Sequence, residues 1–202
     1  MDHLASGEPI IVVAEPAARV RAQPWPVVAL IFGVVSFVEA FYTGHVFAFL
    51  PLYLRLVGTP AGEIGRWTGL LPARLFTVGL PLVPFWGVWA DRHGGTPILV
   101  RSALVEALVA LLVALSHSRG QLAAALLLSG FQLGNTGAML AALRAATPER
   151  RVGLALALLG VAAPVGFAIG PAAGGWLADG TPLGLRGLFA LDAALSLAVA
   201  LL

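Results

Sequence analysis

The sequence predicts an all-α, polytopic membrane protein with six transmembrane helices. Of its 202 residues, 59% are hydrophobic and 11% are charged, whereas an average soluble domain has roughly 25% charged residues. The apolar residues form runs close to the ~20 residues that a helix needs to cross the hydrocarbon core of a bilayer. The charged residues lie mostly between these runs. We therefore expect the apolar surface to face lipid.

Six apolar runs account for most of the chain. Short segments rich in turn formers or charges separate them, and connections this short make neighbouring helices antiparallel. Together they predict a six-helix transmembrane bundle over residues 24–202. The expected spans are Val27 to Leu54, Ile64 to Ala90, Ile98 to Ser116, Leu122 to Leu143, Leu154 to Leu177, and Leu185 to Leu202.

The N-terminal residues 1–23 are more polar, and we expect them to form a flexible cytoplasmic tail rather than a secretory signal. Cytoplasmic loops hold an excess of arginine. Seven arginines on one side against four on the other then predict that the N-terminus lies on the cytoplasmic side of the cell membrane. The inner set is Arg19, Arg21, Arg92, Arg101, Arg144, Arg150 and Arg151, and the outer set is Arg55, Arg66, Arg119 and Arg186.

A charged segment ends the second span, from Gly87 through Asp91 and Arg92 to Gly94. Gly87 would allow close approach of helices, Asp91 could interact with a neighbouring helix N-terminus, and Gly94 permits a tight turn. The alternative is an ordinary charged loop. This segment resembles the loop motif G-x-L-A-D-R-x-G-R-[RK] of the major facilitator superfamily.

The fifth span contains Gly166, Gly170, Pro171, Gly174 and Gly175. Glycines four residues apart lie on one helix face and form a groove for a partner helix, and an internal proline removes a hydrogen bond and bends the helix. Generic small-residue packing explains this spacing but not the Gly-Pro and Gly-Gly pairs. The segment resembles G-x-x-x-G-P-x-x-G-G, the antiporter signature of the same superfamily.

The resemblance covers nearly the whole chain from Val27 onward. It implies the N-terminal half of a twelve-helix transporter, built as two inverted three-helix repeats and similar to drug:proton antiporters. The expected partners are a small-molecule substrate, protons, the lipid bilayer and a second six-helix half. The last apolar run stops at Leu202 without a polar end, so we expect either a fragment or a half-size protein.

One family motif is degraded in the fourth span. Where relatives have R-x-x-Q-G, this chain keeps Gln132 but has Ser129 in the position of the arginine. The resemblance ties that arginine to proton coupling. Arg74, in the second span, could serve a similar electrostatic role.

Ionisable residues inside a span usually face the bundle interior or an aqueous cavity. Glu39 lies 12 residues past Val27, about 18 Å from the inner edge, and Arg74 lies about 15 Å from the outer edge, so the two share nearly the same depth. Our hypothesis is that Glu39 is the protonatable carboxylate of the transport cavity and binds a proton or a cationic substrate. The alternative is a static Glu39–Arg74 pair that orients two helices.

Gln132 is a candidate for the same cavity, and so are three further residues. His45 lies about 120° round the helix from Glu39, and packing or an interfacial position is favoured over a proton relay. Glu106 and Asp192 could line the cavity or snorkel toward an edge.

The functional prediction is transport by alternating access, with proton-coupled efflux of amphipathic compounds. The alternatives are a nutrient importer or uniporter of the same superfamily and a six-span protein without transport. The scattered arginines do not form a nucleic-acid-binding patch, and the chain has no cysteine for a thiolate site. We expect no enzymatic activity, no cofactor and no metal, because the spans show no paired histidine ligands and no nucleophile with a base at helical spacing.

Overall fold

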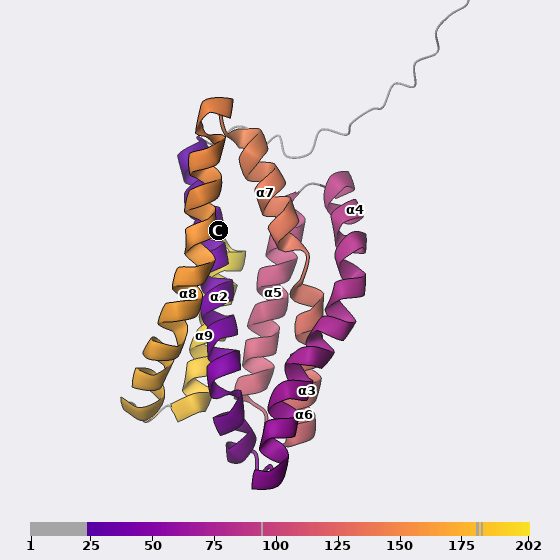
Figure 1. Ribbon diagram of the computed structural model, residues 1–202, viewed down its shortest axis with the longest axis vertical. Helices are drawn as coiled ribbons and strands as arrows, with labels where there is room; N and C mark the ends of the chain where they lie inside the picture. The colour runs from indigo at the N-terminus through magenta and orange to yellow at the C-terminus, as the bar shows by residue number, and fades with distance from the viewer. Residues whose placement is uncertain (1–23, 94, 181, 183) are drawn as a thin grey trace, which may run out of the picture.

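A computed structural model describes residues 24–93, 95–180, 182 and 184–202. The predicted tail over residues 1–23 and the motif residue Gly94 lie outside this part of the chain. Every element of the described residues is a helix, arranged as an elongated bundle (Figure 1). The structure therefore confirms an all-α, polytopic fold.

The helices form six segments in the predicted order. Five are long and apolar enough to cross a membrane, and the last, α9, is a shorter helix of 17 residues. The elements are α2 (Trp25–Leu56), α3 (Ala61–Gly79), η1 (Leu80–Leu82), α4 (Val83–His93), α5 (Gly95–Ala114), α6 (Arg119–Leu128), η2 (Ser129–Gln132), α7 (Asn135–Ala146), η3 (Glu149–Arg151), α8 (Val152–Gly180) and α9 (Gly184–Ala200).

The second segment is composite rather than the continuous helix that the sequence predicts. The α-helical pattern of α3 gives way to the 3₁₀ turn η1 before α4 begins. Pro81 lies within this turn and Pro84 follows it, and neither residue has an N–H group for an α-helical hydrogen bond. The prolines thus explain why the hydrogen-bond pattern changes at this point.

The fourth span is present as expected, over Arg119–Ala146, but its helix is broken near the middle. After η2, Leu133 is extended and Gly134 has φ of +102°, a left-handed conformation that glycine adopts without strain. The α7 helix then restarts at Asn135. The break leaves the Gln132 and Leu133 carbonyls outside a regular helix and free to accept other donors.

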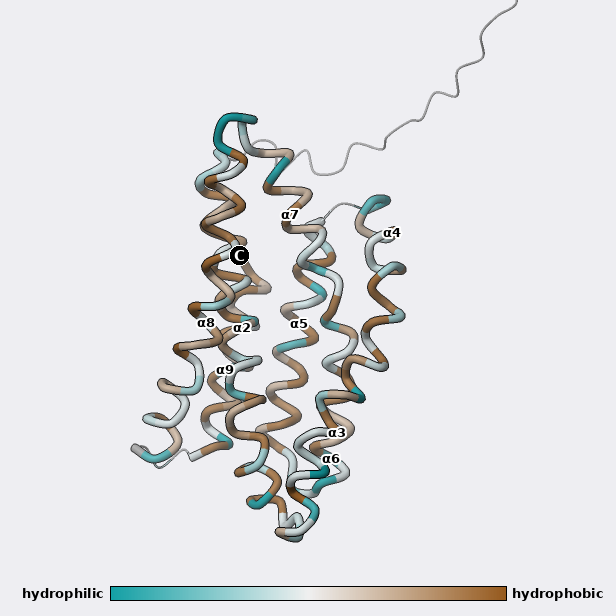
Figure 2. Tube along the Cα trace, in the orientation of Figure 1, coloured by the Kyte–Doolittle hydropathy of each residue, from teal (hydrophilic) through white to brown (hydrophobic). Residues whose placement is uncertain are grey.

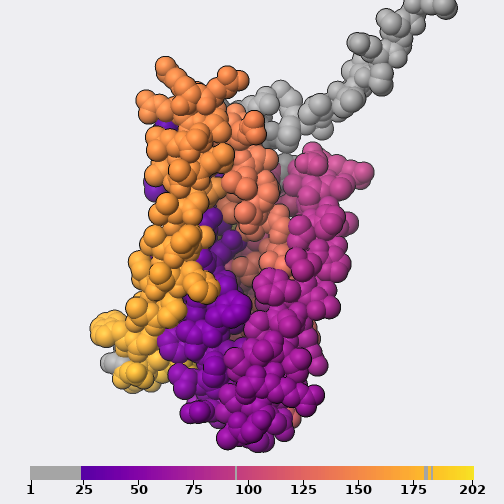
Figure 3. Space-filling view, in the orientation of Figure 1, coloured from indigo at the N-terminus to yellow at the C-terminus, as the bar shows by residue number. Residues whose placement is uncertain are grey.

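The two helices at the centre of the bundle are α2 and α5. Half of the most apolar window of each is buried, against 11% for the α3–α4 segment and 17% for α8. The α2 helix packs along α8 and the α5 helix along α9. In the space-filling view, α8 and the α3–α4 segment flank a hollowed face in which α2 is visible between them (Figure 3).

The buried interior has two apolar clusters with a polar layer between them. One cluster contains Leu54, Val113 and Leu122, and the other contains Val28, Leu143 and Leu159. Between these levels the helices carry buried polar side chains. Figure 2 shows hydrophilic colour gathered at the two ends of the bundle and isolated hydrophilic positions along the helices.

Candidate functional site

The polar layer draws its side chains from α2, α5, the broken fourth segment and α9. Its titratable members on these helices are Glu39, His45, Arg101, Glu106 and Asp192. Glu39, Glu106 and Asp192 are near the middle of their helical segments, so these carboxyl groups lie at mid-membrane depth. His45 and Arg101 are joined to this level by their interactions with Asp192 and Glu39. Polar groups at this depth need protein partners because lipid supplies none. The fully buried polar residues of the layer are Ser36, His45, Ser102, Glu106, Ser129, Asn135, Asp192 and Ser196.

Glu39, on α2, receives its hydrogen bond from the start of α7. The Asn135 side-chain amide donates to the Glu39 carboxylate. The guanidinium of Arg101, on α5, is close enough to interact electrostatically with the same carboxylate. Glu39 itself is only partly buried, so a ligand or water can still reach it.

Arg101 is attached to the break in the fourth segment. Its Nη2 donates to the Leu133 carbonyl at 3.0 Å, to the Gln132 carbonyl at 3.3 Å and to Ser102 Oγ at 2.9 Å. Its guanidinium also stacks over the Trp86 ring at 3.7 Å, which is a cation–π contact. Arg101 thus satisfies the backbone carbonyls that the break exposes.

The Arg101 contacts correct two expectations. The sequence placed Arg101 among the inner-loop arginines, but its guanidinium binds groups inside the bundle. The alternative of a static Glu39–Arg74 pair is not found either, because Arg74 is exposed and lies 5.7 Å from the Trp67 ring centroid on its own helix. Equal depth did not bring Arg74 to Glu39, because the rotation of α3 about its axis turns its side chain elsewhere.

Glu106, on α5, is 1% exposed and accepts hydrogen bonds from two other elements. Gln132 Nε2 donates to one carboxylate oxygen, and Ser196 Oγ donates to the other at 2.6 Å. Glu106 also interacts electrostatically with Glu39 and Asp192. This burial favours the cavity-lining alternative for Glu106 over snorkelling to a membrane edge.

The break in the fourth segment therefore serves both glutamates. Gln132, before the break, contacts Glu106 on α5, and Asn135, after it, contacts Glu39 on α2. In a continuous helix, residues three apart lie on the same face. The extended Leu133 and left-handed Gly134 allow the two amides to reach carboxylates on different helices.

His45 has acceptors at both ring nitrogens and is fully buried. Its Nε2 lies 2.8 Å from the Gly170 carbonyl oxygen, and its Nδ1 lies 2.9 Å from both carboxyl oxygens of Asp192. A carbonyl oxygen only accepts, so Nε2 carries a proton. The pair is either imidazolium with carboxylate or neutral imidazole with a protonated carboxyl, and both have zero net charge.

The glycines of the fifth span form the predicted smooth face, and its partner is α2. A Cβ on Gly166 would collide with the Phe37 carbonyl, and one on Gly170 would lie 2.7 Å from the Phe41 carbonyl. At Gly174 a Cβ would lie 2.8 Å from His45 Cδ2, so this glycine makes room for the buried ring. Gly175 is different, because nothing lies within 4 Å of its added Cβ.

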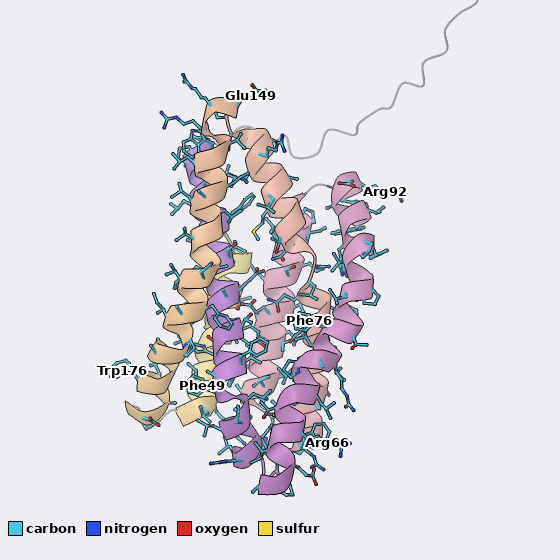
Figure 4. All side chains as sticks on the ribbon, in the orientation of Figure 1. Phe49, Arg66, Phe76, Arg92, Glu149 and Trp176 are labelled. Carbon is cyan, nitrogen blue, oxygen red and sulfur yellow. The ribbon has the colours of Figure 1, made fainter. Side chains whose placement is uncertain are left out.

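The loop motif takes no part in the polar layer. Asp91 and Arg92 are exposed, as Gly87 is, and Figure 4 shows Arg92 at the end of α4. A Cβ on Gly87 would meet nothing within 4 Å, so the expected close approach at Gly87 is absent from the described part of the chain. The expected contact of Asp91 with a helix N-terminus is likewise not seen among the described residues.

A pocket of about 110 Å³ adjoins the layer. It lies between α2, α3 and the α6–η2 segment, and its lining is mostly apolar. The polar residues that line it are Tyr42, Thr43, Ser129 and Gln132. Gln132 also donates to Glu106, so one side chain belongs both to the pocket and to the carboxylate layer.

An all-helical polytopic fold with a hydrogen-bonded charged layer inside the bundle is typical of membrane proteins that carry a functional site between their helices. The sequence profile described as Major Facilitator Superfamily matches residues 32–202. The chain belongs to the Major Facilitator Superfamily.

Curated relatives are proteins named multidrug resistance protein MdtG. The chain is 37% identical to the protein of Citrobacter koseri over 176 residues, 83% of this chain and 42% of the relative. It is 37% identical to that of Salmonella typhi over 167 residues, 79% and 40% of the two chains. It is 36% identical to that of Klebsiella pneumoniae over 168 residues, again 79% and 40%. The chain thus spans about two fifths of the length of these relatives.

Sequence reasoning missed Asn135, the place of Arg101 in the site, and the buried serines Ser36, Ser102 and Ser196. Asn135 follows a glycine, and that pair is a turn signal which could have indicated a helix restart. Arg101 lies six residues past Gly95, the first residue of α5, and this depth was itself a signal that the side chain is not in a loop.

Proposed function

We propose that this chain forms one half of an alternating-access transporter that exports amphipathic compounds in exchange for protons. The proposal includes a second six-helix half, a site facing that half at mid-depth, an N-terminus on the cytoplasmic side and a place in the cell membrane. Support comes from the family, from the name multidrug resistance protein carried by the relatives, and from the charge of the polar layer.

The charge balance of the layer carries the proposal. When ionised, Glu39, Glu106 and Asp192 supply three negative charges, and Arg101 and protonated His45 supply two positive charges. The layer as described then has one negative charge in excess. An uncompensated charge in the membrane interior is costly, so the layer favours the binding of one proton or one monovalent cationic group.

Glu39 is the residue where this exchange would take place. Asp192 is held by His45, and Glu106 is enclosed by Gln132 and Ser196. Glu39 is the partly exposed carboxylate of the three. A proton or the cationic end of a substrate can neutralise the layer there, but both together would overcompensate it.

Transport in proteoliposomes tests the proposal. The chain is joined to the part of the Citrobacter koseri relative that follows the matched region, and export of tetraphenylphosphonium is driven by a pH gradient. Glu39→Gln is expected to abolish the response to the gradient, because an amide cannot exchange a proton. The matched control is Glu63→Gln, because Glu63 is 46% exposed and pairs with Arg119 away from the layer.

Unchanged pH-driven exchange in Glu39→Gln would remove Glu39 from the mechanism. A membrane-inserted chimera that moves the cation without any response to the pH gradient would instead favour a uniporter.

A further inference from the structure

The pocket beside the polar layer contains two buried hydroxyl groups without a hydrogen-bond partner. Tyr42 and Ser129 are each 3% exposed, and both line the pocket. The two hydroxyls lie within hydrogen-bonding range of each other, but neither makes a hydrogen bond of normal geometry among the described residues. Buried polar groups are nearly always paired, so these two hydroxyls point to a missing partner.

The other polar groups of the pocket are already occupied. The Thr43 hydroxyl donates to the Glu39 backbone carbonyl at 2.7 Å, and the Gln132 amide donates to Glu106. A ligand in the pocket would therefore find two free donors, Tyr42 and Ser129. It would find no charged side chain among the lining residues.

The apolar lining of the pocket also restricts the chemical class of ligand that it can bind. Phe47 on α2 contributes an aromatic ring. Phe76 on α3 contributes another (Figure 4), and leucines complete the walls. Aromatic and aliphatic walls with a small number of polar groups are typical of sites for small organic ligands. An uncharged aromatic group fits this lining, whereas a charged group would lose its hydration without gaining a partner.

We propose that the pocket binds the uncharged aromatic end of a substrate through a carbonyl group that accepts hydrogen bonds from Tyr42 and Ser129. A carbonyl oxygen has two lone pairs and can accept from both hydroxyls at once. The proposal rests on the proposed export function, since a cationic end of the same substrate would then lie at Glu39. Thr43 and Glu39 are one helical turn apart on the same face of α2, so one amphipathic molecule can reach both places.

Photolabelling with benzophenone tests the pocket without any transport step. Benzophenone is an uncharged aromatic ketone, and irradiation attaches it to nearby C–H bonds that mass spectrometry can locate. In lipid nanodiscs, we expect the label on pocket residues of α3 and of α6–η2. Photolabelling is repeated with a tagged benzophenone and an untagged competitor. Diphenylmethane, which has the rings but no carbonyl, should compete about tenfold less effectively than untagged benzophenone, as expected for the loss of ligand hydrogen bonds.

Three variants separate hydrogen bonding from simple filling of the pocket. Tyr42→Phe and Ser129→Ala each remove one hydroxyl and should reduce labelling about fivefold, the usual effect of one hydrogen bond. Thr68→Val is the matched control, because it removes a threonine hydroxyl that bonds to the Ile64 carbonyl of its own helix outside the pocket lining, and its labelling should be unchanged. Leu71→Trp fills the pocket and should abolish labelling there.

Specific results would overturn the proposal. Labelling that Leu71→Trp removes, but that Tyr42→Phe with Ser129→Ala leaves unchanged, would show a pocket filled by apolar matter such as an acyl chain. Labelling confined to other surfaces would exclude the pocket altogether. Glu39→Gln should leave labelling intact, so failure of the pocket and failure of proton exchange are distinguishable.

Discussion

His45 donates through Nε2 to the Gly170 carbonyl and shares a proton through Nδ1 with Asp192, and so joins three helices through one ring. Gly170 belongs to the glycine face of α8, and Gly174 on the same face leaves the space that the ring occupies. The antiporter-like motif therefore packs against α2 and also accommodates and hydrogen-bonds the buried His45 ring.

The first prediction concerns the His45–Asp192 pair. His45→Leu should destabilise the bundle by about 3 kcal/mol because it leaves the Asp192 carboxyl buried without its partner, and Asp192→Leu should act similarly. The double variant should lose less than the sum of the two. A double-mutant cycle from reversible unfolding in mixed micelles measures this coupling. Additive losses would show that the two residues stabilise the fold independently.

The second prediction concerns the glycine face of α8. Gly166→Ala should destabilise the bundle by about 1–3 kcal/mol, because its methyl group meets the Phe37 backbone, which cannot move aside easily. Gly174→Ala should also displace the His45 ring. Gly175→Ala is the matched control and should be neutral or slightly stabilising, since its methyl group meets open space. The same unfolding measurement checks all three, and equal effects at Gly166 and Gly175 would contradict the packing argument.

The third prediction concerns Arg101 and the broken helix. Arg101→Lys keeps the charge but loses the planar guanidinium that contacts two carbonyls and stacks on Trp86. Hydrogen exchange at residues 129–134 should become faster. Arg74→Lys, at an exposed arginine that also stacks on a tryptophan, should leave exchange in this segment unchanged. Equal protection in both variants would mean that the break does not depend on Arg101.

The fourth prediction concerns the charge balance of the polar layer. Tetraphenylphosphonium binding to the chain in nanodiscs should weaken as the pH falls, because protons compete with the cation for the excess negative charge. Glu106→Gln removes that excess, so binding should become weaker and nearly independent of pH. The control is Glu149→Gln, since Glu149 is exposed at the end of the bundle (Figure 4). A pH dependence of binding that persists in Glu106→Gln would contradict the assignment of one excess negative charge to the polar layer.

The sequence predicted the helical segments well where apolar length decides them. The first span was expected to run from Val27 to Leu54 and was found as Trp25–Leu56. The two agree because a long apolar run in lipid must form a helix to satisfy its backbone hydrogen bonds. It did not predict the break at Gly134, since a single glycine in an apolar run is also compatible with a continuous helix. The alternative of a Glu39–Arg74 pair failed for a related reason, because it depended on matching depths alone.

What the sequence by itself determined is which stretches lie in the membrane, their order, and the small-residue face of α8, because hydrophobic length and a four-residue spacing are local properties. What only the tertiary structure decided is which side chains meet. Successive helical residues are separated by 100° about the axis, and the rotation of each helix is set by packing against its neighbours. That rotation brings Arg101 to Glu39 and Asp192 to His45, and it turns Arg74 away. The break in the fourth segment adds the contacts of Asn135 with Glu39 and of Gln132 with Glu106.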